Sequence, residues 1–186
     1  MFDREKFKEL TLYICWRAGG SFPKLGAQRL GATKLNKILW YSDVLSYSEL
    51  GKPVTDAVYV KRQFGPVPKE IMPIRKELEA EGALVSRQED FFGKQQTQFF
   101  ALRKPKLVRF TADEISLIDS IIEWVCDEHS AASISATSHD RIWDAAEIGE
   151  ELPLFTIFAS QAGEVTEDDM AWATDLAERE GLGGAN

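Results

Sequence analysis

The chain is poor in the residues from which most catalytic and metal sites are built. Its 186 residues include two cysteines and two histidines, His129 and His139. A structural zinc site needs four ligands at spacings such as Cys-x2-Cys, and no such spacing occurs here. No Ser-His-Asp order is present, and Gly19-Gly20-Ser21 lacks the lysine and the spacing of a phosphate-binding loop. We therefore expect no catalytic residues, no metal and no cofactor.

Long apolar runs are also missing from the sequence. No stretch approaches the roughly 20 apolar residues that a membrane-spanning helix requires, and the charged N-terminus MFDREKFKEL lacks the apolar centre of a secretory signal. Cys15 and Cys126 both fall on apolar faces of predicted helices, which favours buried thiols over a disulfide framework. These features predict a globular cytoplasmic protein that does not associate with a membrane.

Positive charge is almost absent from the C-terminal part of the chain. Residues 110–186 contain 2 Lys and Arg against 18 Asp and Glu, a net charge of −16. Residues 1–109 contain 20 Lys and Arg against 12 Asp and Glu, a net charge of +8. Such asymmetry indicates a basic and an acidic face that either bind each other or serve different partners. It does not by itself indicate nucleic-acid binding.

A helix that begins at Thr33 is the element against which the rest of the chain is expected to pack. Thr33 is a suitable N-cap, and Gly51 stands where a left-handed residue ends a helix. Apolar residues recur at helical spacing on two adjacent sides, which is typical of a helix with neighbours on both. One line is Leu35, Ile38, Leu39, Ser42 and Leu45, and the other is Trp40, Val44 and Tyr47, with Asp43 beside them.

The remaining pattern predicts an α+β fold that is mostly helical. Further helices are expected at residues 3–18, 68–81 and 111–129, the last of which opens with a capping box of Thr111 and Glu114. A short helix capped by Ser138 is expected to run to about Glu147, and an acidic helix is expected from Thr166. Residues 83–87 and 97–102 alternate as two strands of a hairpin. A helix followed by such a hairpin resembles the end of a winged helix, so we expect a central helix wrapped by other helices with a winged-helix-like β-hairpin.

Three shorter segments are less regular. Residues 56–61 fit either an extended segment or a helical turn. Residues 64–68 predict a sharp turn, because two prolines fix φ and Gly65 leaves the backbone free to bend. Residues 130–136 are small and predict a loop.

Asp43 is the most unusual polar position, because it shares a face with aromatic residues and a buried carboxylate must be paired or protonated. Its partner is expected among Lys61, Arg62 and His139. Such a pair either fixes the packing of the helix, which we favour, or contacts a partner. His139 and Asp140 either join Asp43 in a hard-metal or acid–base cluster or, as we favour, serve a turn, with His139 bonded to backbone or a carboxylate.

Four short segments in this order resemble the Panacea domain, a family of SocA-like antitoxins also described as phage-associated proteins. The segments are KLNKILWYSD, GKPVT, FGPVP and SHDRIWD. They are similar to the family's leucine-rich helix that enters an aromatic pair and an Asp, to its G-x-P-[IV] and G-P-V segments, and to its later histidine–tryptophan segment. Trp40 stands where the family has Tyr or Phe. The resemblance covers roughly residues 5–150.

This resemblance implies an antitoxin that binds and blocks a protein toxin encoded by a neighbouring gene, in a family whose module is paired with many unrelated toxins. Residues 1–160 are then expected to form a Panacea-like antitoxin domain, and residues 161–186 an acidic C-terminal helix and disordered tail. The segments that carry the resemblance also supply candidate partner-binding or motif residues, which are Tyr41, Asp43, Gly65, Pro66, His139, Asp140 and Trp143. Lys61 joins these candidates as a possible partner of Asp43.

Two other functions remain open. One is a winged-helix DNA-binding transcriptional regulator that uses the basic N-terminal part of the chain. We do not favour it, because the helix expected at residues 68–81 mixes its Lys and Arg with four Glu, so that its face is no clear phosphate track. The other is an adapter that delivers a bound protein to a protease.

Overall fold

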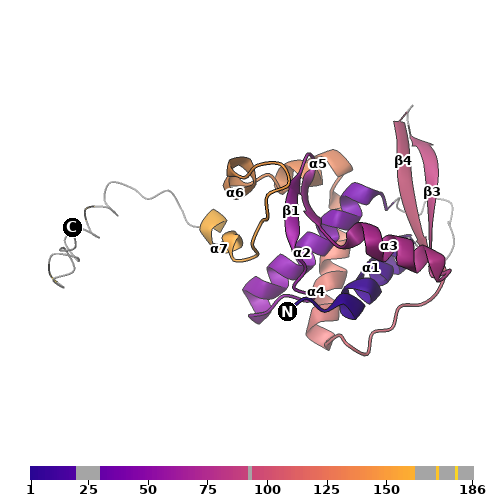
Figure 1. Cartoon of the computed structure of the whole chain (residues 1–186). Coiled ribbons are helices and arrows are strands. Elements are labelled where there is room, and N and C mark those ends of the chain that lie inside the picture. Colours follow the sequence, from indigo (N-terminus) through magenta and orange to yellow (C-terminus); the bar gives the residue numbers. More distant parts are fainter. Residues whose placement is uncertain (20–29, 92–93, 162–170, 172–178, 180–186) are drawn as a thin grey trace.

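The protein is centred on one long helix, α2 (Ala32–Leu50), as a computed structural model shows (Figure 1). The structure describes residues 1–19, 30–91, 94–161, 171 and 179. Helix α1 (Arg4–Gly19), strand β2 (Gly65–Pro68), α4 (Ala112–Glu123) and α5 (Ala131–Thr137) all pack on α2. The predicted mostly helical α+β fold with a central helix is confirmed. Within the described residues, no helix has the length and apolar character needed to cross a membrane.

Helix α2 begins slightly earlier than predicted. Its N-cap is Gly31, which makes no side-chain cap, and the expected cap at Thr33 is wrong. The reason is tertiary: Gly31 is extended and forms an isolated bridge with Gln98, so the helix starts directly after this contact. The end is as predicted, because Gly51 adopts the left-handed conformation with φ 74°.

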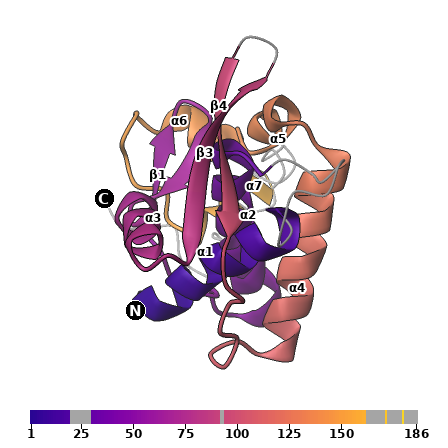
Figure 2. The ribbon, with the colours of Figure 1, turned by 90° about the vertical axis from the view of Figure 1, so that its right-hand side faces the viewer.

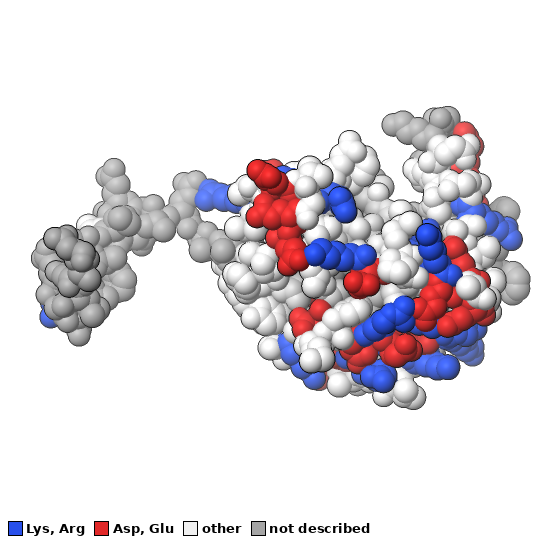
Figure 3. Space-filling model, viewed as in Figure 1, with Lys and Arg blue, Asp and Glu red and all other residues white. Residues whose placement is uncertain are grey.

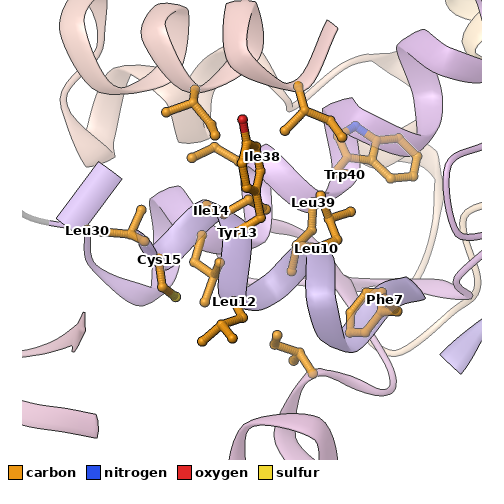
Figure 4. Close-up of a cluster of buried hydrophobic side chains, with 14 of the residues drawn as sticks. Phe7, Leu10, Leu12, Tyr13, Ile14, Cys15, Leu30, Ile38, Leu39 and Trp40 are labelled. Carbon is orange, nitrogen blue, oxygen red and sulfur yellow. The ribbon is translucent and has the colours of Figure 1, made fainter. Parts of the chain in front are cut away.

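The main core lies between α1 and α2 (Figure 4). Phe7, Leu10 and Ile14 of α1 meet Ile38 and Leu39 of α2, and all five are fully buried. Burying one such side chain contributes about 1.5–3 kcal/mol, so this contact is a large share of the driving force for folding. Cys15 and Cys126 are both buried and free, as the sequence predicts.

Residues 56–61 fit either an extended segment or a helical turn by sequence, and the structure places their second half in the extended strand β1 (Tyr59–Arg62). Strand β2 pairs with β1 in the antiparallel sense. The sharp turn expected at residues 64–68 is therefore wrong: the chain turns before Gly65, and the two prolines lie in a strand. Proline is tolerated there because β2 is an edge strand. The other edge of β1 is occupied by residues 149–152, with Lys61 N–H donating to Glu150 O at 2.8 Å and Leu152 N–H to Tyr59 O at 2.8 Å.

Helix α3 (Ile71–Ala80) and the hairpin β3 (Leu84–Phe91)–β4 (Lys94–Ala101) follow the predicted winged-helix order. Pro73 lies in the first turn of α3, where its missing N–H costs no helical hydrogen bond. Both strands are longer than predicted and pair from Leu84–Ala101 to Phe91–Lys94. Figure 2 shows the hairpin extending beyond the helices, with its base beside α1.

After the predicted capping box of Thr111 and Glu114, helix α4 continues into a π-helical turn (Trp124–Glu128). The loop expected at residues 130–136 is wrong, because Ser130 and Ser133 form a reciprocal cap that starts α5. The next helix, α6 (Arg141–Ala145), is capped by Asp140 rather than by Ser138. Helix α7 (Thr156–Gln161) follows, and the acidic helix expected from Thr166 lies outside the described residues.

Ion pairs connect the basic and acidic parts of the chain. Lys6 Nζ lies 2.8 Å from Glu114 in a buried pair, and Arg17 Nε lies 3.0 Å from Asp119. Arg4 and Lys8 pair instead with Glu77 within the first part, and Figure 3 shows Lys and Arg interleaved with Asp and Glu over α1 and α3. The molecule therefore neutralises part of its own charge asymmetry.

Candidate functional site

The motif residues fall into two side-chain networks that both start on α2. The first is centred on Asp43, which has 0% of its surface exposed. Its Oδ1 accepts from the backbone N–H of Thr55 at 2.6 Å, and its Oδ2 accepts from the Thr55 hydroxyl at 2.7 Å. The hydroxyl of Tyr59 lies 2.9 Å from Oδ2, and Ala57 N–H donates to the same oxygen at 3.4 Å. Asp43 thus holds two residues of the segment between α2 and β1, Thr55 and Ala57, and the first residue of β1, Tyr59.

The partners of Asp43 are neutral donors, so the expected pairing with Lys61, Arg62 or His139 is wrong. Burial raises the pKa of Asp43, and the hydrogen bonds from Thr55, Tyr59 and Ala57 act in the opposite direction. The Tyr59 hydroxyl also lies 2.7 Å from Leu39 O, and its single proton serves one of the two acceptors at a time. The network fixes the loop to α2 without a buried ion pair.

The second network is centred on Lys37, which is 1% exposed although it carries an amine. Its Nζ donates to the Ser138 hydroxyl at 2.5 Å, and burial lowers its pKa to about 7. A Cβ placed on Gly65 would lie 1.6 Å from this nitrogen, and Gly65 has φ 107°. Both facts require glycine at position 65, where the G-P-V segment begins. The amine is enclosed between α2, β2 and the end of α5.

The histidine–tryptophan segment directly follows Ser138, the partner of Lys37, and packs against Lys61 of β1. Asp140 Oδ1 accepts from Trp143 N–H at 2.8 Å and caps α6. The rings of His139 and Trp143 are stacked, with centroids 3.5 Å apart and planes 2° from parallel. Lys61 Nζ lies 3.9 Å from the Trp143 ring centroid and donates to Ala146 O at 3.0 Å. Burial lowers the pKa of His139, and the charges of Lys37 and Lys61 act in the same direction.

The structure therefore brings Lys61, Gly65, His139 and Trp143 together and leaves Asp43 in a separate network. The less favoured alternative, a cluster of Asp43, His139 and Asp140, is wrong, and no group of three potential metal ligands occurs among the described residues. His139 packs on an indole ring, so its expected side-chain bond to backbone or a carboxylate is not the main contact.

Tyr41 and Pro66 lie at the margins of these networks. The Tyr41 ring packs edge-on against Trp124 at 5.0 Å, and burial, with the charge of Asp140, raises its pKa to about 12. Pro66 lies opposite Lys61 in the β1–β2 ladder. Both residues contribute packing at these margins.

Sequence reasoning missed Lys37, although a signal for it exists. Trp40, Val44 and Tyr47 form the second apolar line of α2, and Lys37 is the position three residues before Trp40 on the same line. A lysine that continues a buried line at this spacing is a candidate for burial. Ser138 was interpreted as a helix cap, but its hydroxyl donates to Ser135 O at 2.8 Å and accepts from Lys37.

A groove of about 430 Å³ adjoins the Asp43 network. One wall is formed by Tyr47, Pro53 and residues 56–59, and the other by residues 151–155. Phe2 also lines it. Ala57 and Tyr59 belong both to the groove and to the hydrogen-bond network of Asp43, so the family motif sets the shape of one wall.

Comparison with known families agrees with the resemblance found in the sequence. The chain matches the family described as "Antitoxin SocA-like, Panacea domain" over residues 35–144, more than half of its length. The chain belongs to this family. Searches of curated proteins and of solved structures gave no match.

The Panacea match includes both side-chain networks and the first wall of the groove. It ends before Glu151, so the second wall lies outside the matched residues. Membership of this family supports an antitoxin-like role.

Proposed function

We propose that this Panacea-domain protein is the antitoxin of a toxin–antitoxin system and neutralises a co-encoded protein toxin by binding it directly. The observation that carries the proposal is the family match over residues 35–144. The binding unit is residues 1–160, and residues 161–186 are an acidic appendage to it.

The motif geometry supports a binding role rather than catalysis. Asp43 accepts hydrogen bonds from neutral groups inside the core, and Lys37 donates to Ser138 without reaching solvent. A catalytic group must touch a substrate, and neither side chain is accessible to one. The motif residues instead shape a framework that presents other side chains. Large apolar side chains exposed on that framework include Phe64, Ile148, Phe155 and Phe158.

DNA binding is the less favoured function. Arg4 and Lys8 of α1 pair with Glu77 of α3, so part of the basic N-terminal charge is already neutralised. A DNA reader needs cations left free to contact phosphates.

Co-expression tests the proposal. The product of the neighbouring gene, expressed alone, is expected to arrest growth, and co-expression of this protein is expected to restore growth and give a co-purifying complex. A harmless neighbour that forms no complex would refute the antitoxin assignment. Rescue that requires a cellular protease and lowers the amount of toxin would instead identify a delivery adapter.

A further inference from the structure

We propose that the groove beside the Asp43 network is the docking site for the partner protein, and that it takes a segment with an apolar side chain next to Lys or Arg. This inference rests on the proposed antitoxin function. It adds the surface of this chain that makes the contact and the chemistry of the segment that fits it.

The apolar part of the argument comes from both walls. Val58 is 42% exposed on the first wall, and Phe155 is 62% exposed on the second. They border a concave space of about 430 Å³, which is within the range of sites that enclose a ligand or an anchoring side chain. An aromatic side chain at the edge of a groove loses exposed apolar surface when a partner fills it, and such anchors dominate interface energies.

The walls are fixed before any partner arrives. Thr55 and Ala57 are bonded to Asp43, and Asp56 between them holds a positive φ of 57°. The second wall is tied to β1 through Leu152 N–H and Tyr59 O. A groove whose backbone is held in this way has little conformational freedom to lose on binding, so more of the contact energy appears as affinity.

The charge around the groove selects a cationic partner. Residues 144–155 contain four exposed carboxylates and no Lys or Arg, and Figure 3 shows Asp and Glu gathered beside α6. The two carboxylates that line the groove are both paired, Glu151 with Lys69 and Asp56 with the N-terminal amine of Met1. Two other cations lie against this segment: Lys61 donates to Asp144 O and Ala146 O, and Arg62 lies against Gly149. Carboxylates remain in excess, and complementary charge favours a partner with Lys or Arg at this position. The four are Asp144, Glu147, Glu150 and Glu151.

The two walls differ in their relation to the family. The first lies within residues 35–144, which match the Panacea domain, whereas residues 151–155 lie outside the match. The groove thus combines a family framework with a segment that the match does not include.

Binding of the purified co-encoded protein, measured by calorimetry, tests the docking site. Val58→Glu and Phe155→Glu place a charge in the groove and are each expected to weaken binding by about tenfold or more. Val108→Glu is the matched control, because Val108 is 94% exposed and does not line the groove. Its affinity is expected to equal that of the wild type, and thermal melts should show all three variants folded.

Charge reversal tests the chemistry of the partner. Glu147→Lys is expected to weaken binding severalfold and to reduce its dependence on salt, because one attractive carboxylate is lost. Glu123→Lys is the control, since Glu123 is exposed on α4, outside the carboxylate-rich segment 144–155 to which Glu147 belongs. Equal effects of the two reversals would show only a general charge attraction and would overturn the cationic specificity.

The outcomes separate the two proposals. If the wild type binds and folded Val58→Glu and Phe155→Glu bind equally well, the groove assignment is overturned while the antitoxin function stands. If the wild type does not bind, both are overturned. Two results would assign the groove to another occupant: a wild-type dimer that Val58→Glu dissociates, or loss of proteolytic protection of residues 164–186 in Val58→Glu at unchanged partner affinity.

Discussion

The buried amine of Lys37 should make the stability of the protein depend on pH, and Lys37→Met should remove this dependence. Methionine has a similar length and lacks the charge. The Ser138 hydroxyl still donates to Ser135 O in the variant, so the change leaves no buried donor unpaired.

The direction in which the free energy of unfolding changes with pH follows from the lowered pKa of Lys37. Burial reduces the pKa of Lys37 from 10.5 to about 7, so between these values the unfolded chain binds more protons than the folded one. The free energy of unfolding therefore rises with pH above about 7, by up to about 1.4 kcal/mol per pH unit for one proton. Integrated from pH 7 to 8.5, the wild type gains about 1.5 kcal/mol from this residue. Below pH 7 the destabilisation is fully present, and Lys37→Met should be more stable than the wild type there.

Urea unfolding followed by tryptophan fluorescence measures the effect at several pH values in this range. The lowered pKa of His139 places its titration below this window. Burial raises the pKa of the Cys15 and Cys126 thiols, so their ionisation in the unfolded chain lowers stability towards the top of the window, but equally in the wild type and in Lys37→Met, and it cancels when the two are compared. Lys76→Met, at an exposed position of α3, is the control and should keep the wild-type slope. A Lys37→Met variant with the same pH dependence as the wild type would refute the reasoning.

Three further predictions concern the same framework and the less favoured function, DNA binding. Gly65→Ala should destabilise the protein by about 2 kcal/mol more than Gly51→Ala, because both glycines have positive φ but only Gly65 touches Lys37 Nζ; equal urea midpoints would contradict this. Asp43→Ala should cost about 3 kcal/mol or more and Asp43→Asn less, because alanine leaves the Thr55 donors unpaired; an unchanged melting temperature would place Asp43 outside the core. Fluorescence anisotropy should show no sequence-specific DNA binding near 10⁻⁸ M, the affinity typical of dedicated readers, at physiological salt.

The sequence predicts best what is decided locally. The capping box at Thr111 depends on residues three positions apart, and the end of α2 depends on the conformational freedom of Gly51. Helical periodicity correctly places Asp43 in the core, because the spacing of the apolar residues around it shows which side of the helix is buried. Each of these signals lies within a few residues of the feature that it predicts.

The sequence fails where the partner is distant or where two local signals compete. Asp43 was expected to pair with a charge, but the segment after Gly51 folds back and supplies neutral donors from Thr55. Pro66 and Pro68 indicate a turn locally, yet pairing with β1 holds them in a strand. Such contacts depend on the path of the chain through space, and no pattern within a short window contains that path.

The position of β1 limits how motif substitutions can be interpreted. This strand pairs on one edge with β2, whose Gly65 lies against Lys37, and on the other edge with residues 149–152, which lead into the second wall of the groove. Strand β1 therefore connects the Lys37 network to that wall. Tyr59, on the same strand, also connects β1 to Asp43 through its hydroxyl. A substitution at a motif residue that weakens partner binding can therefore act by shifting a groove wall through β1 without any direct contact. Direct contact is demonstrated only by exposed groove positions such as Val58, whose side chain can be changed without altering either network.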